Sequence, residues 1–266
     1  MRNKRVLIFL LGFCSFYTQC QTKEPPKPMD TEFTITPCQI TYKGKEIPLG
    51  KPIDAWVELF GPYSRNFNEH TYIWDSLGVA IFNSCITAYD TNVDKEKRKC
   101  DQLYIFFVNL DSKVGQAGKL QFAWQRKSFE FIEKDYQSIK EPMSEELKKR
   151  IIGRIEPKEK YIYPFTPYTQ TVNLQGAPVK SGMSLNEVNK ERSKIKGLEK
   201  MGYWDNDGDW SWDSGSTTIK TGEFREQKDH SSICPNQDYW YYITLRYSEG
   251  ELEYLKVEYL SKENEK

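Results

Sequence analysis

Short stretches in which apolar and polar residues alternate recur along the chain, and this pattern predicts β-strands. A strand with one buried face shows such alternation. The expected strands include 33–36, 39–42, 72–74, 79–82, 103–110, 119–124 and 128–132. Two longer aromatic-rich runs, Tyr239–Tyr247 and Leu252–Leu260, are separated only by Ser248–Gly250 and predict a hairpin.

Apolar residues at helical spacing predict three helices. One covers Ile53–Phe60 and ends at Gly61, which is followed by proline. Another begins at Ser184–Glu187, whose Ser-x-x-Glu sequence forms a capping box. The third follows Ser144 and two glutamates, which complement the helix dipole, and its apolar stripe extends to Ile155.

One short unit occurs twice in the sequence. Each copy has two glycines six residues apart, apolar residues three and six positions after the second glycine, and a later Trp-Asp-Ser triplet. The first copy contains Ile40–Gly44, Gly50, Ile53, Trp56 and Trp74-Asp75-Ser76, and the second contains Val172–Gly176, Gly182, Leu185, Val188 and Trp212-Asp213-Ser214. This repetition predicts two structural units.

The expected fold class is α+β, with two similar repeats that each pack a helix segment on an antiparallel sheet. We expect a signal peptide at 1–19, a tether at 20–32, a first repeat at 33–133, a connector with one helix at 134–168 and a second repeat at 169–262.

The amino terminus resembles a secretory signal. Arg2, Lys4 and Arg5 precede the apolar run Val6–Phe16, which is too short to span a bilayer. Tyr17-Thr18-Gln19-Cys20 resembles a bacterial lipoprotein box, although Gln19 stands where that pattern has a small residue. The resemblance implies that Cys20 is lipidated and that the protein is an outer-membrane or surface lipoprotein of the cell envelope. Ordinary cleavage after Cys20 is the alternative, and it would give a secreted or periplasmic soluble protein.

Charge composition argues against nucleic acid as a partner. The chain has 38 basic and 38 acidic residues, and loss of 1–19 would leave an acidic excess of about three. A nucleic-acid-binding protein normally has a basic excess on one face.

Four cysteines outside the signal are candidates for disulfides in an oxidising compartment: Cys38, Cys85, Cys100 and Cys234. We favour a Cys85–Cys100 bridge, because these two flank one charged loop, and a Cys38–Cys234 bridge would then connect the two halves. The spacing of these cysteines indicates neither a redox motif nor a zinc site.

Signatures of catalysis or cofactor binding are weak. The only histidines, His70 and His230, have no nucleophile elbow near them. The acidic run Asp205–Asp209 resembles part of a calcium loop, but its glycine is at the fourth position instead of the sixth, so a solvated turn is the favoured interpretation. We expect no enzyme activity, no metal and no cofactor.

Exposed aromatic residues are the candidate binding groups. Trp210 and Trp212 lie beside the acidic run, and Trp240 and Tyr242 lie in the first strand of the predicted hairpin. Alternate residues of a strand face opposite sides, so half of the hairpin aromatics belong to a core. The others would form a sheet face of the kind found at protein interfaces.

The repeated unit resembles known bacterial architectures over Ile35–Leu110 and Thr169–Leu260. It is similar to the tandem α+β repeats of β-lactamase inhibitor proteins and of small outer-membrane assembly lipoproteins. It also resembles uncharacterised toxin-immunity-like domains in which a Trp-Asp-x-x-Gly turn recurs. The resemblance implies a non-catalytic membrane lipoprotein that binds another protein. The alternatives are a structural envelope-assembly lipoprotein and a carbohydrate-binding or hydrolytic surface protein.

Overall fold

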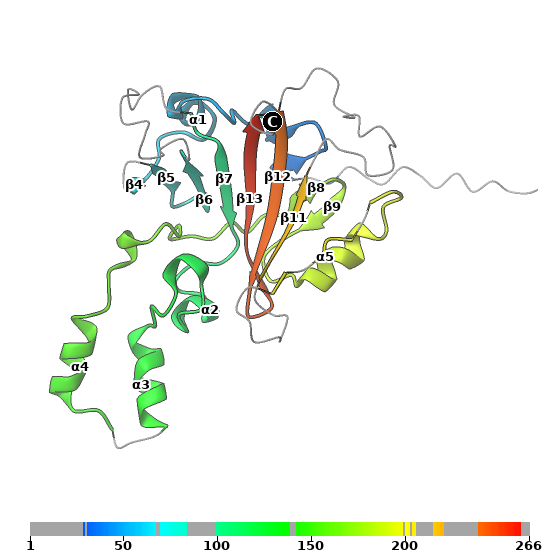
Figure 1. The fold of residues 1–266 in the computed structure, drawn as a ribbon. Coiled ribbons are helices and arrows are strands. Elements are labelled where there is room, and N and C mark those ends of the chain that lie inside the picture. Colours follow the sequence, from blue (N-terminus) through cyan, green and yellow to red (C-terminus); the bar gives the residue numbers. More distant parts are fainter. Residues whose placement is uncertain are drawn as a thin grey trace, which may run out of the picture.

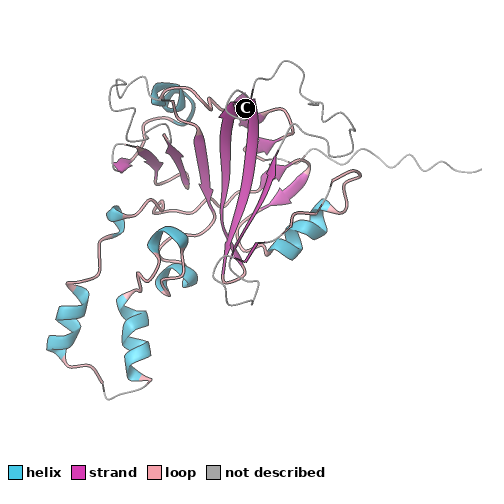
Figure 2. Ribbon diagram, in the orientation of Figure 1, coloured by secondary structure: helices cyan, strands magenta, loops and turns pink. Residues whose placement is uncertain are grey.

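The computed structural model describes residues 29, 31–67, 70–83, 99–138, 142–198, 200–202, 204–205, 215–220 and 239–261. These ranges form an α+β fold, as expected, that is mostly sheet with a few short helices (Figure 1). Figure 2 shows that most strands gather in one body while several helices lie outside it.

Two sheets make up the body. The larger has the order β10-β11-β12-β13-β7-β6-β5-β4, and all its neighbouring pairs are antiparallel. Its strands are β4 (Arg65–Phe67), β5 (Thr71–Trp74), β6 (Val79–Phe82), β7 (Gln102–Phe106), β10 (Trp204–Asp205), β11 (Gly215–Lys220), β12 (Tyr239–Ser248) and β13 (Glu251–Ser261).

The smaller sheet has the order β3-β2-β1-β8-β9 and contains one parallel pair, β1 with β8. Its strands are β1 (Phe33–Ile35), β2 (Ile40–Tyr42), β3 (Lys45–Glu46), β8 (Val172–Leu174) and β9 (Ala177–Val179). The hairpins β2–β3 and β8–β9 therefore lie on opposite sides of β1.

Local sequence signals explain where the helices begin and end. The helical segments are α1 (Ile53–Phe60), α2 (Lys113–Gln116), η2 (Gln121–Ala123), α3 (Phe129–Gln137), α4 (Glu145–Ile152), η3 (Lys158–Lys160) and α5 (Leu185–Arg192). α1 ends at Gly61, whose φ is 81°. Ser144 caps α4, and the predicted capping box of Ser184 and Glu187 is present at α5.

The first hydrophobic core lies between the two sheets. It includes Phe33 and Val172 from the smaller sheet, Leu103 and Leu255 from the larger one, and Trp56 from α1. Phe33, Trp56, Leu103, Val172 and Leu255 are all fully buried. This core holds the two sheets and the helices α1 and α5 together, because Val188 of α5 belongs to it as well.

A second core covers the opposite face of the larger sheet. β5, β6, β7 and β13 contribute residues that alternate with those of the first core, among them Ile73, Ala80, Phe106 and Tyr254. The other side of this core comes from the segment between β7 and β8, which contributes Val114, Leu120, Ala123, Ile162 and Tyr163. The central strands are therefore buried on both faces.

The lobe, which we define as the described residues from 111 to 165, leaves the body after β7 and returns before β8. Its helices α3 and α4 (green in Figure 1) project away from the sheets as a pair. The expected strands at 119–124 and 128–132 are wrong, because η2 and α3 occupy these positions. Ser128 accepts a hydrogen bond from the Phe131 amide and caps α3, so this local capping signal prevails over the strand-like aromatic pattern.

The cysteine pairing that we favoured is also wrong. Cys100 is a buried thiol in the first core, so it does not form the expected bridge with Cys85, a residue outside the described ranges. Cys38 is disulfide-bonded, and its partner lies outside the described residues. The Cys38–Cys234 pairing therefore stays a prediction.

Gly78 and Gly182 provide a matched test of a close backbone contact. Their φ angles are 79° and 78°, but a Cβ on Gly78 would lie 2.3 Å from the Tyr168 amide nitrogen, whereas one on Gly182 would meet nothing within 4 Å. Gly182→Ala should cost only the left-handed conformational penalty, about 1–2 kcal/mol. Gly78→Ala should cost about 3 kcal/mol or more, because the clash adds to that penalty. Urea unfolding of both variants measures the difference, and equal losses would contradict the contact.

Candidate functional site

A partly buried ion pair fixes the returning end of the lobe to the larger sheet. Arg65 donates from Nε and Nη2 to the two carboxylate oxygens of Asp75 at 2.8 and 3.0 Å. The Phe165 amide donates to the same carboxylate at 3.0 Å. Arg65 also donates to the carbonyl oxygens of Tyr161 at 2.8 Å and Tyr163 at 2.7 Å. Asp75, which the sequence presented as part of a repeat marker, therefore anchors the lobe.

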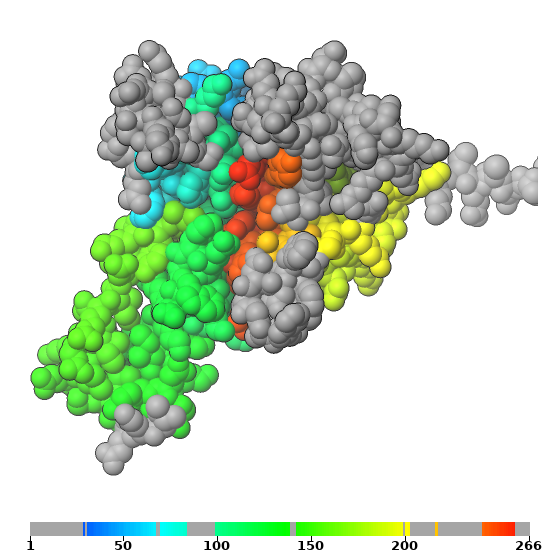
Figure 3. Space-filling model, viewed as in Figure 1, coloured from blue at the N-terminus to red at the C-terminus, as the bar shows by residue number. Residues whose placement is uncertain are grey.

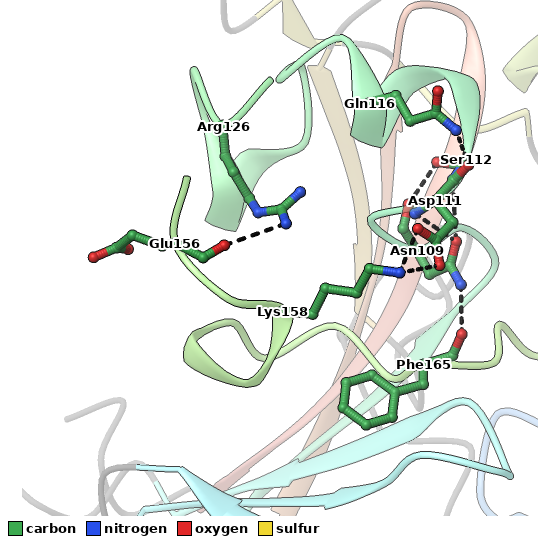
Figure 4. A network of polar contacts seen from close by, with 8 residues as sticks. All are labelled: Asn109, Asp111, Ser112, Gln116, Arg126, Glu156, Lys158 and Phe165. Atoms are coloured by element: carbon green, nitrogen blue, oxygen red, sulfur yellow. Dashed lines mark hydrogen bonds and ion pairs between the residues drawn. The ribbon is translucent and has the colours of Figure 1, made fainter. Parts of the chain in front are cut away.

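A second set of contacts ties the outgoing chain to the returning chain (Figure 4). The Asn109 side-chain amide donates to the Phe165 carbonyl at 2.6 Å. The Lys158 ammonium lies 2.5 Å from the Asp111 carboxylate, and Arg126 donates to the Glu156 carbonyl at 3.3 Å. These contacts close the base of the lobe.

A buried carboxylate connects the lobe to β13. Glu253 is fully buried, and its oxygens accept hydrogen bonds from the Tyr163 hydroxyl at 2.5 Å, from the Gln121 amide at 3.2 Å and from the Ser248 hydroxyl. Arg246 Nε lies 3.9 Å from the same carboxylate. Burial raises the pKa of Glu253 and holds the pKa of Tyr163 well above its ordinary value.

Glu253, Ser248 and Tyr163 are residue types that can act in catalysis, but a substrate cannot reach them. Glu253 and Ser248 have no exposed surface, and only 1% of Tyr163 is exposed. A catalytic acid or base must come within hydrogen-bond reach of its substrate. We therefore interpret the Glu253 network as a structural anchor of the lobe.

The candidate site is a pocket at the base of the helix pair, with a volume of about 460 Å³. Five residues form its apolar wall. Ile132 belongs to α3, Ile151 to α4, and Ile155 follows α4; the aromatic residues Trp124 and Tyr161 lie outside the two helices. Trp124 is 57% exposed. Concave, mostly apolar surfaces with a few polar groups are the usual form of ligand sites.

Charged residues around the pocket make it cationic. Arg126, Lys127 and Arg154 line it together with one acid, Glu156. Lys127 is paired with Asp135 at 2.6 Å, and the Arg126 guanidinium lies 5.4 Å from the centre of the Tyr161 ring. Two arginines with apolar surface beside them suit an anion that also carries an apolar group.

The helix pair beside the pocket covers its own apolar residues only in part. Neither α3 nor α4 contains a buried residue, and Ile152 of α4 is 53% exposed. The ion pair of Glu133 with Lys148, at 3.1 Å, joins the two helices, and hydrogen bonds to Glu133 and Glu145 raise the pKa of Lys148. The lobe thus exposes both apolar and basic groups.

The sequence-predicted site residues do not form this pocket. Trp210, Trp212, Cys20, Cys85, Cys234 and residues 206–209 of the acidic run lie outside the described residues. Trp240 is placed in β12 opposite Leu260, but its side chain is outside the described part.

Tyr242 lies in β12 opposite Glu258 and Lys220 and is half-buried. Its neighbours Tyr241 and Ile243 belong to the first core, so the expected alternation is confirmed there.

The pocket was missed because its residues are dispersed between 124 and 161. One signal was present: Trp124 is a large aromatic residue with Gln125, Arg126 and Lys127 directly after it. The apolar alternation Leu120, Phe122, Trp124 stops at this basic run, so Trp124 is the end of an apolar pattern and not its middle.

No group of three or more His, Cys, Asp or Glu side chains within the described ranges is placed to hold a metal ion. No helix among the described residues is long and apolar enough to cross a membrane.

The Glu253 network predicts a pH-dependent difference in stability. The pKa of Glu253 is raised in the folded state above its ordinary 4.5, so the folded protein binds more protons than the unfolded chain between these two values. The contribution of this group to stability therefore falls as pH rises through that window. A glutamine side chain does not titrate, so the free energy of unfolding of Glu253→Gln minus that of wild type should rise with pH. The rise should be at most about 1.4 kcal/mol per pH unit. Urea unfolding from pH 4.5 to 8 measures this, and a flat or falling difference would contradict it.

Comparison with known proteins places the chain in a family. Residues 32–189, more than half of the chain, match the model of a domain of unknown function (DUF7738). No curated protein and no solved structure matches. The matched range includes the whole lobe and its pocket. The chain therefore belongs to the DUF7738 family.

Proposed function

We propose that this chain is an exported lipoprotein of the cell envelope that works by binding another protein, of inhibitor or immunity type, and that it catalyses no reaction. The observation that carries the proposal is the lobe, in which two helices extend from the body without a buried residue. The apolar residues of these helices are half-buried, except Ile152, which is 53% exposed. Apolar surface that its own chain covers only in part is suited to a partner's surface.

The lobe is a better candidate surface than the sheet face expected from the sequence. Trp124 and Ile152 are the most exposed of the large apolar side chains in the described ranges. Around Tyr242, the described neighbours on the same face are polar, since Lys256 pairs with Glu258 at 2.7 Å. Tryptophan and arginine are also the residue types that dominate binding energy at protein interfaces.

The finer architecture that we propose is two similar repeats, each with a helix segment on antiparallel strands. The turns Lys43-Gly44 and Gln175-Gly176 support it, because all four residues have positive φ, as the two-residue type I′ hairpin turn requires. Gly50 and Gly182 precede α1 and α5 with φ of 74° and 78°. Three strands lie on each side of the β7–β13 pair in the larger sheet, in the reciprocal orders β6-β5-β4 and β12-β11-β10. The second Trp-Asp-Ser triplet lies outside the described residues.

Attachment through Cys20 is the proposed link to the membrane. It is supported by the charged start, the short apolar run and the resemblance of residues 17–20 to a lipoprotein box. Residues 23–30 contain three prolines, a composition typical of an extended spacer.

Replacing the lipidated residue should release the protein from the membrane. In Cys20→Ser the protein should move from the membrane fraction to the soluble fraction and should lose incorporation of a labelled fatty acid. Cys14→Ser, which changes a cysteine inside the apolar run, should keep both. If Cys20→Ser stays in the membrane with its label, another anchor is present and the lipoprotein proposal is wrong.

Affinity capture tests the binding function. The tagged full-length protein, cross-linked in its own cells and purified, should retain one stoichiometric protein partner. Trp124→Ala should lose that partner, because a lobe hot spot is removed, whereas Tyr242→Ala should retain it.

The reverse pattern in the two variants would move the binding surface to the sheet face. Retention on polysaccharide, with no protein partner, would overturn the protein-binding proposal in favour of a carbohydrate-binding surface protein.

A further inference from the structure

We propose that the pocket at the base of the lobe binds an acidic segment of the partner protein. An apolar side chain of that segment would lie against the isoleucines, and a carboxylate next to it would bind Arg126 and Arg154. This inference rests on the proposed binding function and names the chemistry of the partner.

The two arginines have hydrogen-bond donors that no described residue uses. Within the described ranges the Arg126 side chain gives one hydrogen bond, the 3.3 Å contact from Nη2 to the Glu156 carbonyl. Its Nε has no partner there but is buried, so the terminal nitrogens are the donors within reach of a ligand. The Arg154 side chain makes no hydrogen bond or ion pair with any described residue. A guanidinium group has five N–H donors whose geometry matches a carboxylate.

Two acids near the pocket, Asp135 and Glu156, are already engaged by other groups. Asp135 pairs with Lys127 at 2.6 Å. Glu156 lies 3.3 Å from the Lys160 ammonium and accepts a hydrogen bond from the Tyr161 hydroxyl at 3.2 Å. Neither acid forms an ion pair with Arg126 or Arg154, so both guanidinium charges remain for a ligand.

The segment that forms the pocket carries a small basic excess. Residues 124–161 contain ten lysines and arginines and eight aspartates and glutamates, whereas basic and acidic residues are equal in the chain as a whole. Complementary charge accelerates association and selects the partner. The excess is small, so we expect it to act locally at the pocket instead of as a broad basic surface.

The residue types at the pocket favour a protein over other anions. The pocket volume, about 460 Å³, lies in the range of about 300–1,000 Å³ found for small-ligand sites, so the pocket has room for one short segment of a partner. Trp124, Arg126 and Tyr161 meet at this pocket, and these three residue types are enriched at the energetic centres of protein–protein interfaces. Figure 3 shows the lobe as an outer part of the molecule (green), where a partner protein can approach it.

A random-peptide display experiment tests the proposal without knowledge of the partner. A library of peptides is selected against the purified full-length protein. We expect the enriched peptides to combine Asp or Glu with an adjacent aromatic or aliphatic residue. A synthetic peptide of the enriched sequence is then titrated by fluorescence anisotropy against wild type and two charge-reversal variants.

Arg154→Glu and Arg150→Glu are matched variants. Both residues are exposed and only four positions apart, but Arg154 lines the pocket and Arg150 does not. Arg154→Glu should weaken binding about tenfold or more, because a charged hydrogen-bond partner is replaced by a like charge. Arg150→Glu should change the affinity less than twofold, and Arg126→Gln should weaken it with an unchanged circular dichroism spectrum.

Three results would overturn the proposal: no enriched peptide, enriched peptides without acidic residues, or equal losses in Arg154→Glu and Arg150→Glu. Binding of phosphatidylglycerol vesicles that is lost in Arg154→Glu, with no peptide enriched, would instead assign the pocket to a lipid surface. Each of these outcomes is separable from failure of the proposed function, because affinity capture of a partner does not depend on the peptide result.

Discussion

The antiparallel pairing of β7 with β13 is the contact on which the rest of the fold depends. It sets Leu103 opposite Val257 and Ile105 opposite Leu255, and so joins strands from the two halves of the chain into one sheet. Once these strands are central, both of their faces must be removed from water, since their side chains alternate between two apolar surfaces. The smaller sheet covers one face, and the base of the lobe covers the other.

The lobe therefore has two parts with different physical roles. Its base is held by a carboxylate on each side of the second core: Asp75 binds Arg65 and the returning backbone, and Glu253 binds Tyr163 and the Gln121 amide. Removing one partner of a desolvated charged group leaves the other unsatisfied, which is strongly destabilising. The helices α3 and α4 lie beyond these anchors and contain no buried residue.

The Trp-Asp-Ser triplet at 74–76 shows how one motif can have several structural causes. Trp74 packs in the first core, and its indole N–H donates to the Gly61 carbonyl at 2.8 Å, which fixes the end of α1. Asp75 faces the lobe instead and anchors it through Arg65. One triplet thus connects α1, the larger sheet and the lobe. Its two adjacent side chains, Trp74 and Asp75, stabilise opposite faces of that sheet.

Features that depend on neighbouring residues could be predicted from the sequence. The hairpin of β12 and β13, the helices α1 and α5, and the capping residues Ser144 and Ser184 follow from side-chain periodicity and local hydrogen bonds, and they are present as expected. Four other features are specified by tertiary packing: β1 is parallel to β8, Cys100 is a buried thiol, 129–132 is helical, and Trp124 meets Ile155 and Tyr161 at one pocket. Strand pairing and pocket formation depend on which segments, far apart in the sequence, bury their apolar surfaces against each other. The apolar pattern of one segment shows which face is buried but does not specify the segment that covers it.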